Sequence, residues 1–108
     1  MEELLNKISL KLNAKFSNAI ISSELLYDFP VFTINSANIH DVIRFLKEDD
    51  ELNFHFLTDL TGAQTADEKQ LSVIYHLHNM PKNWRVRVKT YFDINTPEIP
   101  TATDLWPG

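Results

Sequence analysis

The chain has 108 residues, a formal net charge of −5 and no cysteine. This length corresponds to a single domain, and the lack of cysteine excludes a disulfide, a thiolate zinc site and a cysteine-ligated iron–sulfur cluster. The 2 glycines are too few for a phosphate-binding loop of the G-x-G-x-x-G or Walker type. The acidic charge disfavours duplex nucleic acid as the main partner, because binding phosphates requires a basic surface.

Nothing in the sequence indicates a membrane-spanning or targeting segment. No stretch contains the roughly 18 apolar residues that a transmembrane helix needs. Glu2 and Glu3 stand where a secretory signal peptide would carry positive charge. We therefore expect a soluble intracellular protein that associates with a membrane only through a partner.

The first half of the chain predicts a helix, two strands and a second helix. The first helix has an apolar face at helical spacing, formed by Leu4, Leu5, Ile8 and Leu12. Most residues of 19–21 and 29–34 are β-branched or aromatic, which predicts a hairpin of two strands. Asn35 and Ser36 are good caps for the second helix, whose apolar face contains Ile39, Val42, Ile43 and Leu46. Acidic side chains oppose the dipole at a helix C-terminus, so residues 48–51 predict a solvated exit loop.

The second half of the chain predicts three more strands. The first strand has Phe54, Phe56 and Leu60 on one face and ends at Thr61 and Gly62. A polar loop over residues 63–68 then leads into a long hairpin of residues 71–77 and 84–89. Pairing Leu77 with Trp84 places the large apolar side chains of both strands on one face and leaves a four-residue turn over residues 79–82. Shifting the pairing by two residues would put Pro81 into a tight turn that needs a positive φ, which proline cannot adopt.

These elements predict the α+β class. We expect two helices packed on one face of a mainly antiparallel sheet of about four to five strands. The expected order is helix-strand-strand-helix-strand-strand-strand, in one domain over residues 1–108. The C-terminal segment, with prolines at positions 97, 100 and 107, is expected to be extended.

Three histidines are the best candidates for a metal site. His76 and His78 would lie on one face of a strand, and His55 on a neighbouring strand would supply a third ligand. The H-x-H spacing also occurs by chance, no carboxylate has a matching position, and Arg85 close by would repel a cation. Solvated or interface histidines therefore fit the pattern better than a metal site. No sequence around a serine indicates a catalytic triad, so we predict neither a catalytic nor a metal-binding residue.

A basic stripe follows the last predicted strand. Arg85, Arg87 and Lys89 alternate with apolar residues, and Lys82 precedes them in a chain that is acidic elsewhere. The stripe is either an ordinary solvent-facing surface, paired with acids of an adjacent strand, or a docking face for an acidic partner. Both interpretations remain open. Binding of single-stranded nucleic acid would need several aromatic residues on the same face, and Tyr91 alone is too few.

Three segments, in this order, resemble one protein family. The first is F-H-F-L-T-D-L-T-G over residues 54–62, and the second combines V-I-Y-H-L at 73–77 with R-V-R-V-K at 85–89. The third is P-E-I-P-T-A-T-D-L-W-P-G over residues 97–108. Together with R-F-L-K-E-D at 44–49, they resemble the 30 kDa subunit of proton-pumping NADH:quinone oxidoreductase, respiratory complex I.

The resemblance implies a structural role without catalysis. Members of this family form an α+β domain in the hydrophilic arm of the complex and pack on the large, 49 kDa-type subunit that lines the quinone site. FMN, the iron–sulfur clusters and quinone belong to neighbouring subunits, so no cofactor is expected on this chain. The resemblance also implies a peripheral position on the cytoplasmic side of the bacterial inner membrane, or on the matrix side in mitochondria.

The resemblance also suggests interface positions and a missing segment. Residues that match the family and are candidates for partner contacts are Asp59, Thr61, Arg85, Arg87, Asp104, Leu105 and Trp106. In the family, T-D-L-W-P-G continues into a segment containing E-R-E-x-x-D, which is absent here. We therefore expect this chain to be the N-terminal part of a longer subunit. Two alternatives remain: the equivalent domain of a related membrane-bound hydrogenase, and a stand-alone metal-binding or enzyme domain that uses the three histidines.

Overall fold

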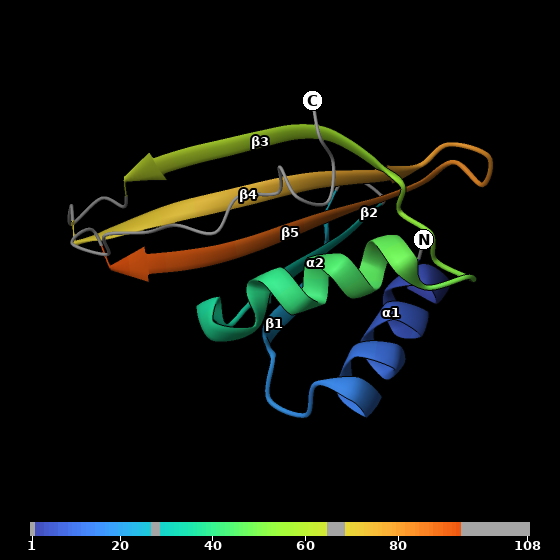
Figure 1. Cartoon of the computed structure of the whole chain (residues 1–108), viewed down its shortest axis with the longest axis horizontal. Coiled ribbons are helices and arrows are strands. Elements are labelled where there is room, and N and C mark those ends of the chain that lie inside the picture. Colours follow the sequence, from blue (N-terminus) through green and yellow to red (C-terminus); the bar gives the residue numbers. More distant parts are fainter. Residues whose placement is uncertain (1, 27–28, 65–68, 94–108) are drawn as a thin grey trace.

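The computed structural model describes residues 2–26, 29–64 and 69–93. Its elements follow the predicted order, with five strands and two α-helices that lie on the same side of strands β3–β5 (Figure 1). The fold class is therefore confirmed as α+β. The predicted extended C-terminal segment, with the candidate interface residues Asp104, Leu105 and Trp106, lies outside the described residues.

Both helices form where the apolar spacing predicted them. Helix α1 spans Glu2–Lys15 and buries Leu4, Ile8 and Leu12. Helix α2 spans Ile39–Glu48 and follows a short 3-10 turn, Ser36–Asn38, in which the Asn35 side chain accepts a hydrogen bond from the Ala37 amide at 3.0 Å. The buried residues of α2 are the four that the sequence singled out, Ile39, Val42, Ile43 and Leu46.

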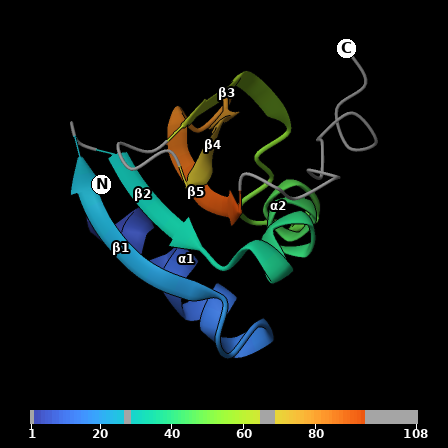
Figure 2. The same cartoon turned by 90° about the vertical axis from the view of Figure 1, so that its left-hand side faces the viewer.

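The five strands form one mixed sheet in the order β1-β2-β5-β4-β3. Strands β1 (Ile20–Leu26) and β2 (Phe29–Ile34) pair antiparallel, as do β3 (Phe56–Gln64) with β4 (Gln70–Asn79) and β4 with β5 (Trp84–Asp93). The only parallel pair among these strands joins β2 to β5. Figure 2 shows the strong twist of the sheet, which turns β1 and β2 away from the direction of the other strands.

Strand β2 lies inside the sheet and is buried on both faces. Phe32 packs in the core beneath the helices. Val31, on the opposite face, is also buried, with only 4% of its surface exposed. This two-sided burial explains the almost continuous apolar sequence of the strand. Pro30 pairs with Leu25 of β1 and precedes the pairing with β5, which begins at Val31, so its missing N–H removes no hydrogen bond from the β5 ladder. The buried Thr90 hydroxyl of β5 donates to the Ile34 carbonyl of β2 at 2.8 Å. This hydrogen bond adds a side-chain contact between the two parallel strands.

The predicted register of the last hairpin is wrong by two residues. Trp84 pairs with Asn79 rather than Leu77, although the predicted core face of both strands is correct. The connection is Met80–Asn83, in which the Asn83 amide donates to the Met80 carbonyl at 3.1 Å. Asn83, not proline, adopts the positive φ of 54°, so Pro81 occupies a position that suits its fixed φ. Trp84 is half-buried against the core.

Strand β3 also departs from the prediction. Phe54 is fully buried, but it precedes the strand, and Asn53 before it has a positive φ of 40°. The His55 amide donates to the Asn53 carbonyl at 2.8 Å, so the chain turns at Phe54, and Phe56 is 48% exposed on the other face of the sheet. The predicted end at Thr61 and Gly62 is wrong as well, because the strand continues to Gln64.

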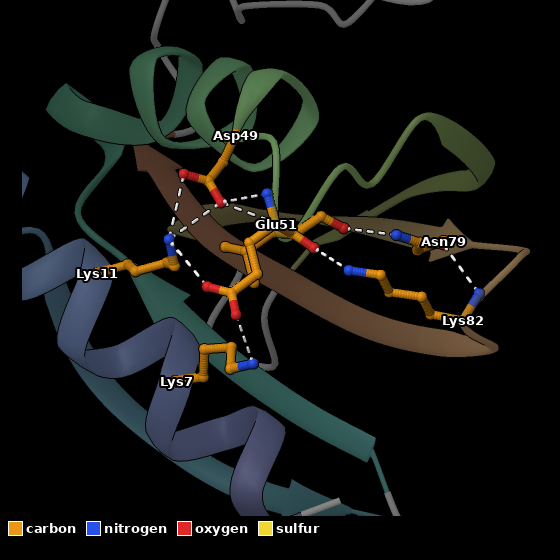
Figure 3. Close-up of polar contacts among 7 residues, drawn as sticks. Lys7, Lys11, Asp49, Glu51, Asn79 and Lys82 are labelled. Carbon is orange, nitrogen blue, oxygen red and sulfur yellow. Dashed lines mark hydrogen bonds and ion pairs between the residues drawn. The ribbon is translucent and has the colours of Figure 1, made fainter.

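The acidic exit loop of α2 forms a junction with α1 rather than a solvated run (Figure 3). The Lys7 ammonium lies 2.8 Å from the Glu51 carboxylate, and Lys11 contacts both Asp49 at 3.2 Å and Glu51 at 3.3 Å. The Asp49 carboxylate also accepts the backbone N–H groups of Glu51 and Leu52. Hydrogen bonds from the two lysines, Lys7 before Lys11, hold the pKa of the Glu51 carboxyl below its ordinary value.

The same loop is joined to the β4–β5 hairpin by Asn79. Its side chain, only 3% exposed, donates Nδ2 to the Leu52 carbonyl at 2.7 Å and accepts the Lys82 backbone N–H at 3.1 Å. Lys82 reaches back and donates Nζ to the Glu51 carbonyl at 2.7 Å. We call these contacts of Lys7, Lys11, Asp49, Glu51, Leu52, Asn79 and Lys82 the acidic-loop junction.

We predict that Asn79→Ala lowers the free energy of unfolding by about 1–3 kcal/mol, because it leaves the Leu52 carbonyl without its buried donor. Urea denaturation measures the loss. Asn6→Ala on the exposed face of α1 is the matched control and should change stability by less than about 0.5 kcal/mol. Equal effects of the two substitutions would show that the Asn79 amide does not hold the hairpin to the loop.

We predict that Glu51 contributes to stability in a pH-dependent way. Its pKa is lowered in the folded state from an ordinary 4.5, so the stabilisation is present above about pH 4.5 and is lost as the pH falls through the folded-state value. The difference in melting temperature between the wild type and Glu51→Gln should therefore shrink on acidification. It should also shrink in about 1 M NaCl, which screens exposed charges. A difference that stays constant with pH would contradict this role.

Candidate functional site

The basic stripe lies on the outer face of the sheet, opposite the helices. Val86, Val88 and Thr90 of β5 are buried in the core, so the alternating residues Arg85, Arg87 and Lys89 lie on the other face. The two-residue shift in register changes their neighbours. Arg85 lies opposite His78, and Arg87 lies between His76 of β4 and Val31 of β2.

A hollow of about 330 Å³ opens on this outer face. Strands β2, β3, β4 and β5 all contribute to its lining. The lining residues are Phe29, Thr58, His76, Leu77, His78, Arg85, Val86 and Arg87. None of the described lining residues is acidic, so we call this feature the basic hollow.

Arg87 is the best positioned cation in the basic hollow. Its guanidinium carbon lies 5.1 Å from the centre of the Phe29 ring, a cation–π distance. The two strands that flank β5 contain no acidic residue, since β2 reads F-P-V-F-T-I and β4 reads Q-L-S-V-I-Y-H-L-H-N. The interpretation in which acids of an adjacent strand pair with the stripe is therefore wrong for β2 and β4.

Two buried polar atoms in the hollow lack hydrogen-bond partners within the described part of the chain. They are Nε of Arg87 and Nε2 of His78. Buried polar groups in native proteins nearly always have a partner, so unpaired atoms call for an explanation. Both atoms belong to residues that line the hollow, on the neighbouring strands β4 and β5.

The three histidines do not assemble into a metal site. His76 and His78 lie on the outer face of β4, whereas His55 precedes β3 and its Nδ1 lies 3.1 Å from the Asn53 carbonyl. Across the described ranges, no three His, Asp or Glu residues are grouped so that they could hold a metal ion. The arrangement of the described residues thus gives the metal-binding alternative no support.

Asp59 and Thr61, two further candidate interface residues, are located by the backbone pairing of their strand. Asp59 and Thr61 lie in β3, where their backbones pair with His76 and Ile74 of β4. Sequence reasoning missed Phe29 because it did not predict that β2 and β5 are neighbours, and it missed Thr58 because it did not predict the register shift between Leu57 and Asp59 in β3. The two-sided apolar sequence of β2 was the one available signal that this strand lies inside the sheet.

Comparison with known proteins identifies the family. A sequence profile described as "Respiratory-chain NADH dehydrogenase, 30 Kd subunit" matches residues 32–108. The chain belongs to this family. The match covers the α2 helix, strands β3–β5 and the C-terminal segment, which are the parts that carried the resemblance in sequence.

Curated relatives agree with this assignment. The NADH-quinone oxidoreductase subunit designated C in Xanthobacter autotrophicus is 33% identical over 109 aligned residues, which covers 100% of this chain and 52% of that protein. The subunit of the same designation in a Roseiflexus species is 37% identical over 100 residues, covering 91% of this chain and 57% of that protein. The chain thus spans a little over half the length of these relatives.

A solved structure shows that the fold is shared more widely. A chain of the membrane-bound sulfane sulfur reductase, described as an archaeal respiratory membrane complex, superposes with a TM-score of 0.74. The two chains are 24% identical, and the match covers 94% of this chain and 59% of the other. Neither helix of the described ranges is long and apolar enough to cross a membrane.

We predict that the chain purified without a histidine tag retains its fold in a chelator. No described histidine, aspartate or glutamate cluster has the arrangement of a metal site, so removing divalent metal should leave its melting temperature unchanged within about 1 °C. Thermal unfolding with and without EDTA, together with elemental analysis, measures this. Stoichiometric zinc and a large drop in melting temperature would restore the metal-binding alternative.

Proposed function

We propose that this chain is a non-catalytic structural part of the hydrophilic arm of NADH:quinone oxidoreductase. The observation that carries the proposal is the family match over residues 32–108, supported by relatives that are named as a subunit of that enzyme. On this proposal the chain helps to assemble the electron-transfer machine and itself makes or breaks no bond. FMN, the iron–sulfur clusters and quinone are bound by neighbouring subunits.

The proposed partner is the large, 49 kDa-type subunit at the quinone site. The outer sheet face supports a docking role, since it presents Arg85 and Arg87 on a strand whose two neighbours, β2 and β4, contain no acidic residue. A chain with a net charge of −5 that presents a row of three cations, Arg85, Arg87 and Lys89, on its outer sheet face is suited to meet an acidic surface in a defined orientation. The interface is proposed to include Asp59, Thr61, Asp104, Leu105 and Trp106 as well.

The proposed location follows from the proposed partner. The chain would be held at the membrane only through the complex, on the cytoplasmic side in bacteria or the matrix side in mitochondria. The alternative partner set is that of a related membrane-bound hydrogenase. The named relatives favour the NADH:quinone enzyme, because they come from that complex.

The test is recovery of partners from native membranes. We predict that the affinity-tagged full-length protein, expressed in its source organism, co-purifies with the large quinone-site subunit after mild detergent extraction. Quantitative mass spectrometry of the eluate identifies the partners. Recovery of hydrogenase subunits instead would favour the alternative, and recovery of neither set would contradict the proposed function.

A further inference from the structure

We propose that the basic hollow receives a carboxylate side chain of the neighbouring subunit, with the Arg87 guanidinium as its main hydrogen-bond donor. This inference rests on the proposed function and adds to it the chemistry of the contact. Three observations carry it, namely the fixed position of Arg87, the unpaired buried nitrogens and the charge of the lining.

The position of Arg87 is fixed before any partner arrives. Its backbone lies in β5, which pairs on one side with β2 at Val31 and on the other side with β4 at His76. Its guanidinium packs near the Phe29 ring at 5.1 Å. A cation held in this way loses little conformational freedom when it forms a further contact, which favours binding.

The unpaired nitrogens specify the chemistry of the ligand. Arg87 Nε is always protonated and can only donate, so its missing partner must be an acceptor. A carboxylate accepts two parallel hydrogen bonds from the Nε edge of a guanidinium. His78 Nε2, the second unpaired buried nitrogen, can also donate when it carries the proton. One carboxylate entering the hollow can therefore satisfy buried groups on two strands.

The charge of the lining selects an anion over a neutral group. Arg85 and Arg87 line the hollow together with His76 and His78, and no described acidic residue lies among them. Elsewhere the chain is acidic, which would repel an acidic surface brought up in the wrong orientation. The hollow is therefore suited to an aspartate or glutamate side chain presented by a partner.

The experiment compares variants of the full-length tagged protein in cells that lack the wild-type copy. The large subunit retained on the tagged protein is quantified while the NaCl concentration is raised. Arg87→Gln should reduce retention roughly tenfold or more at intermediate salt, because truncating one member of a buried charge pair leaves the other unpaired. Arg87→Lys should be intermediate, since lysine keeps the charge but lacks the planar fork.

Lys89→Gln is the matched control. Lys89 lies on the same strand and the same face, two residues along, but does not line the hollow. Its loss should change retention less than about twofold, as is usual for a surface charge pair. Melting temperatures of all variants show whether each is folded. If Arg87→Gln does not fold, Phe29→Leu removes the ring that holds the guanidinium, keeps the charge and should still weaken retention.

The outcomes separate this inference from the proposed function. Wild-type retention in Arg87→Gln, or equal losses in Arg87→Gln and Lys89→Gln, would overturn the carboxylate site while leaving the structural role intact. Full rescue by Arg87→Lys would likewise overturn the bidentate contact. If the wild-type chain retains no oxidoreductase subunit at all, the proposed function fails first.

Discussion

The buried side chain of Asn79 is the contact on which the arrangement of the helices and the long hairpin depends. It bonds at once to the Leu52 carbonyl and to the Lys82 amide, and so joins the exit of α2 to the turn of the hairpin. The loop that it fixes also carries Glu51, whose carboxylate binds Lys7 of α1. Three elements distant in sequence therefore meet at one loop. The bond of Asn79 to the Lys82 amide also supports the turn that joins β4 to β5 in the observed register.

That register determines the composition of the outer face. With Asn79 opposite Trp84, His78 lies beside Arg85, and His76 beside Arg87. The parallel pairing of β2 with β5, supported by the Thr90 hydroxyl, brings Phe29 to the same face as Arg87. The basic hollow is thus a product of two long-range pairings. Its cations come from one strand, but the ring that holds Arg87 and the histidines beside it come from others.

The sequence was sufficient for the parts of the fold that rest on local periodicity. The buried faces of both helices and the inward stripe of β4 and β5 follow from the spacing of apolar residues. The register was mispredicted since either pairing keeps the same side chains on the core face, and the observed turn places the positive φ on Asn83 rather than on Pro81. Phe56 was misplaced because a tight turn at Phe54, closed by the His55 amide on the Asn53 carbonyl, precedes the strand and breaks the alternation. The basic stripe was visible in sequence, but the hollow was not, as it requires the β2–β5 pairing.

The central claim is that this domain joins the rest of the complex through the outer face of its sheet. A structure of the assembled complex, isolated from membranes of the source organism, tests it most directly. We expect the face formed by β2, β5 and β4 to be covered by a neighbouring subunit, with an acidic side chain of that subunit hydrogen-bonded to Arg87. A complex in which this face is open to solvent, while α1 and α2 make the contacts, would contradict the account.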